Sequence, residues 1–234
     1  MVNNNKKFWK DKKVFITGIS GFVGSNLAKT LVRNGAIVIG LTQSKKLDSL
    51  LFYEKIDKKV NLIFGSIIDN ELLNKIFDKY KIEICFHLAA QVEVGSAALN
   101  PLNTWETNVR GTYTLLEVLR ENKKNIKSIV VASTDKAYGN YPISKLPYKE
   151  NYELKAEFPY DTSKACADMI TKSYTKKLFN LPIVITRFAN IYGPGQLNFT
   201  AIIPDSIRSC IKNKKFVMRS DGEAIRDFIY IDDI

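Results

Sequence analysis

Tyr160 and Lys164 are the residues of this 234-residue chain whose types and spacing most directly indicate chemistry. They stand four positions apart in the segment "PYDTSKACAD", so a helix places both side chains on one face. A neighbouring ammonium favours the phenolate form of a tyrosine and lowers the pKa of the phenol toward a range useful for acid–base catalysis. Because such pairs also occur by chance, a catalytic interpretation depends on which other groups the sequence places near them.

A second group of polar residues, Thr134, Asp135 and Lys136, follows the apolar segment "SIVVAS" at 128–133. That segment is typical of a strand buried on both faces. Ligands of open α/β sheets bind beyond the carboxyl ends of the strands. A hydroxyl, a carboxylate and an ammonium at this position therefore predict the edge of an active site, and the alternative is a loop that serves only solubility.

A glycine-rich loop near the start of the chain indicates a dinucleotide cofactor. In "VFITGISGFVGSNL", Gly18, Gly21 and Gly24 form a G-x-x-G-x-x-G pattern between the first predicted strand and the first predicted helix. Glycines let the backbone turn tightly and approach a pyrophosphate, whose charge a helix N-terminus stabilises. This context predicts that the three glycines, with Phe22 and Val23, bind the cofactor. The alternative is a packing turn without a ligand.

The end of the second predicted strand leaves the choice of cofactor open between NAD and NADP. An acidic residue that would bind the adenosine ribose is absent from "IVIGLTQSKK", which offers Thr42 and two further neutral polar residues before Lys45 and Lys46. Neutral side chains can bind the ribose hydroxyls, and we include Thr42 in the predicted cofactor site. The lysines can meet a 2′-phosphate, but a solvated helix start explains them at least as well.

Apolar segments alternate with helical patterns along most of the chain, and this alternation predicts the fold class. The predicted strands are 13–18, 36–41, 60–65, 82–90, 128–133 and 182–188, and the main predicted helices are 21–35, 72–80, 103–122 and 161–179. Strands that are apolar on both faces and separated by helices predict an α/β protein with a doubly wound parallel Rossmann sheet.

The sequence changes character after residue 189, which predicts two domains. We expect a dinucleotide-binding Rossmann domain at 1–189 and the start of a smaller substrate-binding portion at 190–234. In the second portion, 190–199 is turn-rich, 201–213 is helical in pattern and 226–234 is strand-like. Because the chain ends directly after an acidic pair typical of a helix start, we expect this portion to be incomplete and the sequence to be truncated.

Composition and charge narrow the classes of function. The net charge is +11 and the isoelectric point about 9.4, but the lysines are scattered along the chain, so we favour a small anionic ligand over nucleic acid. No apolar segment is long enough to span a membrane. Three widely separated cysteines predict neither a disulfide framework nor a metal site, and a reducing cytoplasm is the expected compartment.

Seven segments in consistent order resemble the extended short-chain dehydrogenase/reductases, in particular the NAD-dependent epimerase/dehydratase family of nucleotide-sugar enzymes. The resemblance runs from Phe8 to Ile234 and is carried by "TGISGFVGSNL", "HLAAQ", "NVRGTYTLLE", "VVASTDKAYG", "PYDTSKACAD", "ITRFANIYGPG" and "RDFIYIDD". It implies a hydroxyl–Tyr–Lys catalytic set of Thr134, Tyr160 and Lys164. It also implies that Ala89 and Ala90 line the NAD site with Tyr160 and Lys164, and that Asn190 and Arg226 contact a nucleotide-sugar substrate.

The resemblance implies structural or packing roles for three further polar residues and a mode of assembly. Asn108 and Arg187 are expected to be structural, and His87, the only histidine, is expected to be a packed ring rather than a base. Members of the family often form homodimers through two long helices, here 103–122 and 161–179. The apolar residues of these helices serve equally well as packing faces on the sheet.

Asp135 and Lys136 are the residues that the resemblance makes informative about the reaction. After the catalytic hydroxyl, 4-epimerases of this family show small or neutral residues, whereas 4,6-dehydratases show an acid. The dTDP-glucose dehydratases carry Asp-Glu there, and the Asp-Lys of this chain is similar to the CDP-glucose 4,6-dehydratases. The implied activity is a lyase reaction that converts a nucleotide-linked hexose to its 4-keto-6-deoxy form.

The implied mechanism assigns the proton transfers to named residues. Tyr160 takes the C4 hydroxyl proton while hydride leaves for the cofactor, and Asp135 protonates the departing C6 hydroxyl. Lys136 either takes the C5 proton or stabilises the enolate. Hydride then returns from the cofactor to C6, so the implied reaction is redox-neutral overall. Because an adjacent cation lowers the pKa of Asp135, its role as a proton donor conflicts with Lys136. The alternatives are a 4-epimerase or reductase on the same scaffold and, more distantly, a non-catalytic dinucleotide-binding protein.

Overall fold

The computed structural model describes residues 2–218, 221–223 and 225–234, with side chains from Lys6 onward. The chain divides into two compact units, Met1–Arg187 and Phe188–Ile234. The first unit carries the glycine-rich loop and the Tyr160–Lys164 pair. Each unit is described by itself.

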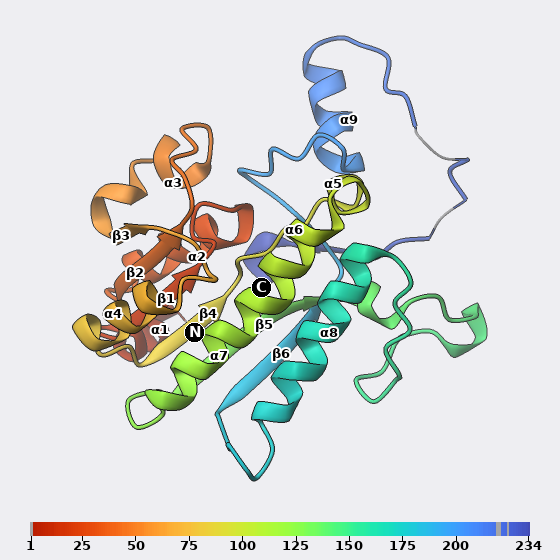
Figure 1. The fold of residues 1–234 in the computed structure, drawn as a ribbon. Helices are drawn as coiled ribbons and strands as arrows, with labels where there is room; N and C mark the ends of the chain where they lie inside the picture. Colours follow the sequence, from red (N-terminus) through yellow and green to blue (C-terminus); the bar gives the residue numbers. More distant parts are fainter. Residues whose placement is uncertain (1, 219–220, 224) are drawn as a thin grey trace. The chain divides into compact units, whose positions relative to one another are not determined.

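Six strands form one sheet in the described part of the chain. They are β1 (Lys13–Thr17), β2 (Ile37–Thr42), β3 (Asn61–Phe64), β4 (Ile84–His87), β5 (Ser128–Thr134) and β6 (Ile183–Phe188). Their order is β3-β2-β1-β4-β5-β6, as Figure 1 allows the reader to follow. β1 pairs in parallel with β2 and β4, with Val14 opposite Val38 and Ile84. The strand order reverses direction beside β1, which is where doubly wound sheets bind their ligands.

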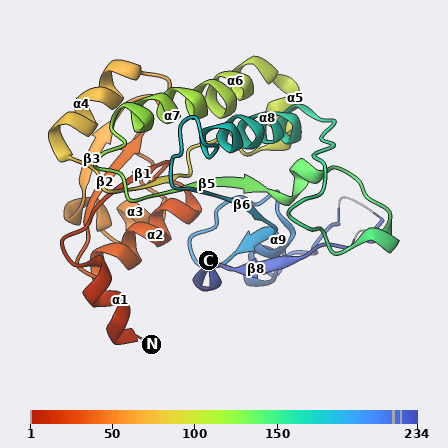
Figure 2. The same ribbon diagram turned by 90° about the horizontal axis from the view of Figure 1, so that it is seen from below.

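Helices cover both faces of this sheet. They include α2 (Phe22–Arg33), α3 (Leu50–Tyr53), α4 (Asn70–Tyr80), α7 (Gly111–Glu121) and α8 (Pro159–Tyr174). Figure 2 shows α4, α7 and α8 on one face and α2 and α3 on the other. Alternate residues of β1 supply the two cores: Phe15 packs on the α4–α7 side, and Val14 and Ile16 pack on the α2–α3 side. The doubly wound parallel Rossmann sheet predicted from the sequence is therefore confirmed.

The predicted strand 82–90 ends earlier, because β4 stops at His87. The backbone N–H groups of Leu88 and Ala89 donate to the side-chain hydroxyl oxygen of Thr17, each at 3.1 Å. The Leu88 N–H also donates to the Thr17 carbonyl oxygen at 3.3 Å, whereas for Ala89 the side-chain acceptor replaces the backbone of the neighbouring strand. The chain leaves the sheet at this point, at the carboxyl end of β1. The apolar sequence carries no signal for that change.

The predicted helix 103–122 is divided into three segments. α6 (Pro101–Trp105) follows the short α5 (Val94–Leu99), a π-helical turn spans Glu106–Arg110, and α7 begins at Gly111. The predicted helix 161–179 is shorter, since α8 ends at Tyr174. At the N-terminus, α1 (Val2–Trp9) precedes β1. π-Helical turns are frequent at functional sites, and this one holds Asn108.

The second unit contains one helix and one pair of strands among its described residues. β7 (Asn190–Tyr192) pairs in parallel with β8 (Phe228–Tyr230), with Ile191 opposite Ile229. α9 (Ile202–Ile211) lies within the predicted helical segment 201–213. The strand-like segment 226–234 forms only β8 and a 3₁₀ turn at Ile231–Asp233.

Candidate active site

The glycine-rich loop between β1 and α2 has a geometry that other residues would disturb. Gly18 has φ of +71°, and a Cβ atom there would lie 2.8 Å from the backbone nitrogen of Ala89. A Cβ atom on Gly24 would lie 2.3 Å from the carbonyl oxygen of Gly18. Backbone atoms cannot yield as flexible side chains do, so this loop requires glycine at both positions. The loop delivers the chain to the N-terminus of α2, where an anionic group is stabilised.

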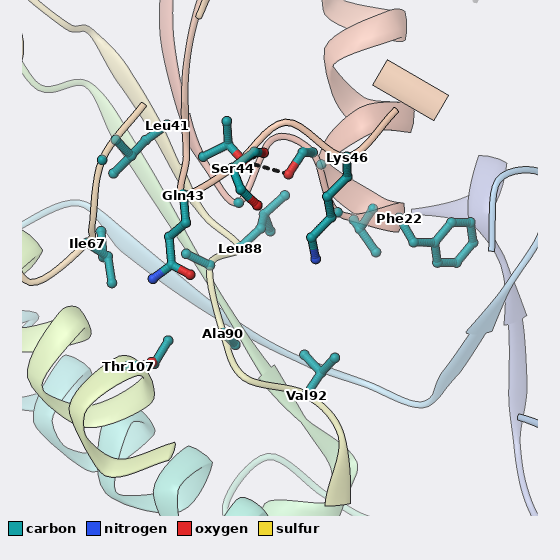
Figure 3. Close-up of a pocket in the computed structure, with 18 residues that line it drawn as sticks. Phe22, Leu41, Gln43, Ser44, Lys46, Ile67, Leu88, Ala90, Val92 and Thr107 are labelled. Atoms are coloured by element: carbon teal, nitrogen blue, oxygen red, sulfur yellow. Dashed lines mark hydrogen bonds between the residues drawn. The ribbon is translucent and has the colours of Figure 1, made fainter. Parts of the chain in front are cut away.

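A pocket of about 380 Å³ lies against this loop (Figure 3). Its lining includes every residue predicted only for the cofactor: Gly18, Gly21, Phe22, Val23, Gly24, Thr42, Ala89 and Ala90. The sequence analysis did not assign seven further lining residues to the site: Ser20, Leu41, Gly65, Ile67, Leu88, Val92 and Thr107. These residues lie on β2, in loops and in the π-helical turn, and their types alone do not indicate a cofactor. The glycine backbone allows close approach of a pyrophosphate, and the pocket adds apolar walls and a helix N-terminus. Together these features fit a dinucleotide.

The carboxyl end of β2 forms another side of the pocket. The Thr42 hydroxyl lies 2.7 Å from the Ser20 hydroxyl and donates to the carbonyl oxygen of Ser44 at 3.1 Å. Gln43, Ser44 and Lys46 line the pocket. The ammonium of Lys45 instead lies 5.8 Å from the ring centroid of Phe52. Only Lys46 of the two consecutive lysines therefore belongs to the pocket.

The residues predicted for acid–base chemistry gather beyond the end of β5. Thr134 ends that strand, and its hydroxyl donates to Oδ1 of Asp135 at 3.1 Å. The Lys136 ammonium lies 5.9 Å from the ring centroid of Tyr160, the second residue of α8. The Thr134 hydroxyl also lowers the pKa of the Tyr160 phenol. The structure thus brings Thr134, Asp135, Lys136 and Tyr160 together.

Lys164 lies one turn further along α8 and is only 8% exposed. Its ammonium donates to the carbonyl oxygen of Ala132 on β5 at 2.6 Å. Burial lowers the pKa of Lys164 to about 8, and the carboxylate of Asp168 partly opposes that shift. Lys164 therefore stays protonated at neutral pH, at a cost in desolvation.

The expectation that Lys164 lowers the pKa of Tyr160 is wrong for this structure. Burial and, to a smaller extent, the nearby carboxylate of Asp161 together raise the pKa of Tyr160 to about 12, although Thr134 lowers it. Desolvation of the phenolate outweighs the effect of a cation whose ammonium is directed to Ala132. The Tyr160 phenol is accordingly protonated at neutral pH.

Asp161 is a residue of this cluster that the sequence analysis missed. One of its carboxylate oxygens is buried and has no hydrogen-bond partner within the described residues. Burial raises the pKa of Asp161, Asp135 raises it as well, and Lys136 opposes the shift. Its position directly after Tyr160 in "PYDTSK" was the one sequence feature that could have identified Asp161 as part of the site. Two carboxyl groups and one ammonium therefore surround the Tyr160 phenol.

His87 is a buried ring with both nitrogens engaged. Its Nδ1 lies 2.8 Å from the Thr17 hydroxyl, and its Nε2 lies 3.0 Å from the Thr112 hydroxyl. Burial lowers the pKa of His87 to about 3, and the Lys164 ammonium lowers it further. His87 is therefore neutral at physiological pH, in agreement with the packed ring expected from the sequence.

Asn108 connects a loop of the pocket to α8, the helix that carries Tyr160 and Lys164. Its amide accepts from the backbone N–H of Gln91 at 2.8 Å and donates to the Gln91 carbonyl oxygen at 3.0 Å. It also donates to Ser163 at 2.8 Å, and the Ser163 hydroxyl donates to the Tyr160 carbonyl oxygen at 2.6 Å. These contacts give Asn108 the structural role expected for it.

Arg187 forms a second structural connection. It donates to both carboxylate oxygens of Asp168, at 2.8 and 3.0 Å, and to the Tyr138 hydroxyl at 2.7 Å. The carboxylate of Asp168 is almost fully buried, and its contact raises the pKa of Arg187 above the usual range. Helix α8 is thus tied to β6 and to the 3₁₀ turn that begins at Asp135.

Asn190 and Arg226 belong to the second unit. The Asn190 amide donates to the carbonyl oxygen of Asp227 at 3.2 Å, and Arg226 donates to that of Ile225 at 3.1 Å. Their predicted contact with a nucleotide sugar stays a prediction. Within the described residues no cluster of side chains could hold a metal ion. No helix in that part of the chain is both long and apolar enough to cross a bilayer.

Fold and site together define a Rossmann-fold protein with a dinucleotide pocket beside a buried tyrosine–lysine pair. The sequence model of the NAD dependent epimerase/dehydratase family matches residues 14–234. The chain belongs to this family.

Two curated relatives show how far the likeness extends. The chain is 37% identical to a dTDP-D-glucose 4,6-dehydratase of Dictyostelium discoideum, over 99% of the chain and 55% of the relative. It is 33% identical to a CDP-glucose 4,6-dehydratase of Salmonella typhimurium, over 92% of the chain and 62% of the relative. The chain thus spans somewhat more than half the length of these two relatives.

Solved structures of similar proteins include both an epimerase and a dehydratase. A UDP-glucose 4-epimerase from Thermotoga maritima matches with a TM-score of 0.85 and 28% identity, over 94% of this chain and 70% of the other. A dTDP-glucose 4,6-dehydratase from Streptomyces venezuelae, solved with NAD bound, matches with a TM-score of 0.83 and 27% identity, over 94% and 69%. The family is NAD dependent, and its members act on nucleotide sugars by more than one reaction.

Proposed function

We propose that the protein is a nucleotide-sugar 4,6-dehydratase that uses NAD, with CDP-glucose as the first candidate substrate. The observation that carries the proposal is the placement of Asp135 and Lys136, which put a carboxylate and an ammonium beside the Tyr160 phenol. Removal and return of hydride at C4 needs only the hydroxyl–Tyr–Lys set. Loss of water across C5 and C6 needs a further proton donor and a group that handles the C5 proton. Similarity to dTDP- and CDP-glucose 4,6-dehydratases supports the same reaction.

The first task of the residues is to remove a proton from the C4 hydroxyl. NAD, when bound, supplies a hydride acceptor and a positively charged ring. The buried Tyr160 phenol has a pKa of about 12, so it becomes a base only where positive charge stabilises its phenolate. Lys136 lies over the Tyr160 ring, and the bound cofactor ring would add the further positive charge that the phenolate needs.

The second task is the loss of water, for which the site holds two carboxyl groups. Asp135 lies next to the Thr134 hydroxyl and is our candidate donor to the C6 hydroxyl. Lys136 takes the C5 proton or stabilises the enolate. Asp161, whose pKa is raised by burial, is the second carboxyl able to hold a proton there. Asp161 is therefore a second candidate donor to the departing C6 hydroxyl.

Product analysis tests this proposal. Full-length protein is incubated with CDP-, dTDP- and UDP-glucose, and the products are identified by mass spectrometry. A 4-keto-6-deoxy product, lighter than its substrate by one water, is expected. The variant Asp135→Asn should still reduce bound NAD, seen by absorbance, but should stall before water loss. Product formation by this variant at the wild-type rate would show that Asp135 is not the acid.

A 4-epimerase is the second candidate function, favoured by the similarity to the UDP-glucose 4-epimerase. In that case Asp135 only caps the turn that follows β5, and the same assay yields the C4 epimer without a keto sugar. A reductase on this scaffold would instead consume reduced cofactor stoichiometrically. A non-catalytic dinucleotide-binding protein would show no turnover, but such a protein has no need for a buried tyrosine–lysine pair.

We further propose that the protein forms a homodimer through α6, α7 and α8. Leu102, Tyr113 and Met169 on these helices are 68%, 41% and 64% exposed. Figure 2 shows the three helices together on one face of the sheet. The variant Met169→Lys should shift the protein toward the monomer mass in light scattering. We also propose that residues 190–234 begin the substrate-binding portion and that the protein acts in the cytoplasm.

A further inference from the structure

We propose that the adenosine end of the pocket accepts a 2′-phosphate, that Lys46 binds it, and that the protein therefore binds NADP as well as NAD. The proposal concerns the selectivity of the cofactor site within the proposed function. It does not depend on which sugar is converted, because adenosine phosphates alone test it.

The first observation is that no carboxylate lines the pocket. A carboxylate at the end of the second strand binds ribose hydroxyls and repels a 2′-phosphate, so it is a main determinant of selectivity for NAD. Here β2 ends in Thr42, whose hydroxyl already interacts with Ser20 and with the Ser44 carbonyl oxygen. Gln43 and Ser44 follow as exposed, uncharged residues. Nothing in this lining repels a second phosphate.

The second observation is the ammonium of Lys46. Figure 3 shows the Lys46 and Gln43 side chains extending toward the same open space. Among the described residues, no carboxylate lies within ion-pair distance of the Lys46 ammonium. Its backbone is held in place, because its carbonyl oxygen accepts from the N–H of Ser49 at 2.9 Å. Lys46 therefore presents an uncompensated positive charge at the pocket, where Ser44 offers a neighbouring hydroxyl.

Lys45 supplies a matched comparison within the same sequence. It carries the same charge one position earlier, but it does not line the pocket and its ammonium faces the ring of Phe52. A general attraction of phosphate to a basic loop would involve both lysines equally. Binding of a phosphate inside the pocket would involve Lys46 alone.

Isothermal titration of the protein with adenosine 2′,5′-bisphosphate and with AMP isolates the contribution of the 2′-phosphate. We expect the bisphosphate to bind about tenfold more tightly, which corresponds to about 1.4 kcal/mol, with the advantage decreasing at high salt. Lys46→Gln should abolish the advantage while leaving AMP affinity unchanged, and Lys45→Gln should retain it. Ser44→Asp adds the missing carboxylate and should weaken binding of the bisphosphate without weakening binding of AMP.

Two results would overturn the proposal. Equal affinities of the wild-type protein for AMP and the bisphosphate would show that the 2′-phosphate gains nothing in this pocket. An equal loss of the advantage in Lys45→Gln and Lys46→Gln would show a diffuse attraction rather than a site. Circular dichroism of each variant excludes loss of folding as the cause. No sugar is present, so failure here leaves the dehydratase proposal untouched.

Discussion

The buried ammonium of Lys164 makes the stability of the protein depend on pH in a predictable direction. Burial lowers the pKa of Lys164 from 10.5 to about 8. Between these values the unfolded chain still holds the proton that the folded protein has lost. Stability therefore rises as pH increases through this window, because the unfolded state binds more protons. Below pH 8 the charged side chain is desolvated and costs stability.

The size of this effect follows from the two pKa values. Between pH 7 and pH 9, the folded protein loses most of the Lys164 proton and the unfolded chain loses almost none. The free energy of unfolding should then increase by about 1.3 kcal/mol from this group alone. Replacement of Lys164 by methionine keeps a similar length and removes the titrating group, so this part of the increase should disappear.

Urea unfolding at pH 7 and at pH 9 measures the effect in the wild-type protein, in Lys164→Met and in the control Lys136→Met. The Lys136 side chain is exposed, so its replacement should leave the pH dependence as in the wild type. Other titrating groups, such as the buried Cys85 thiol whose pKa is strongly raised, are common to all three proteins and cancel. If Lys164→Met gains as much stability from pH 7 to pH 9 as the wild type, the buried-cation argument fails.

Three further predictions concern the loop, the structural ion pair and Asp161. Gly24→Ala should abolish NAD binding in titrations and lower the free energy of unfolding, measured in urea, by about 1–3 kcal/mol. The control Gly95→Ala has open space around its Cβ atom and should raise the free energy of unfolding by up to about 1 kcal/mol. Arg187→Met should lower the free energy of unfolding by about 3–5 kcal/mol, because it leaves the Asp168 carboxylate buried without its partner. The double variant Arg187→Met/Asp168→Leu should lose much less stability, and equal losses in the two variants would refute the pairing. Asp161→Asn should be more stable than the wild type at pH 7, because burial raises the pKa of Asp161 and its ionised form is disfavoured. That gain should vanish as pH falls below 3.8, and a gain that persists there would contradict the assignment.

The sequence predicted the sheet well, because each strand is an apolar segment bounded by polar or glycine residues. The glycine-rich loop and the residues beyond β5 were also placed correctly at one end of the sheet, since parallel strands end on the same edge. The extent of β4 could not be predicted. Its end depends on the Thr17 hydroxyl, a contact between residues about seventy positions apart in the chain.

The electrostatics of the site were the least predictable feature, because burial is a property of the folded chain. Four-residue spacing correctly placed Tyr160 and Lys164 on one helix, but spacing says nothing about where an ammonium finds its hydrogen bond. Ala132, whose carbonyl oxygen binds Lys164, is an ordinary strand residue in the sequence. Likewise, the sequence does not reveal that one Asp161 oxygen is buried without a hydrogen-bond partner, because its burial depends on the packing of α8 beside β5.

Burial shifts the pKa values of Tyr160 and Lys164 in opposite directions, and both shifts have the same consequence. A pKa of about 12 keeps the phenol neutral, and a pKa of about 8 brings the ammonium closer to losing its proton near neutral pH. Each shift reduces the charge that the folded site holds. A phenolate forms there more readily with added positive charge, so the base catalysis that we propose for Tyr160 is coupled to binding of a cationic ring. In the dehydratase reaction that we propose, Lys136 over the phenol contributes to oxidation at C4 as well as to the loss of water.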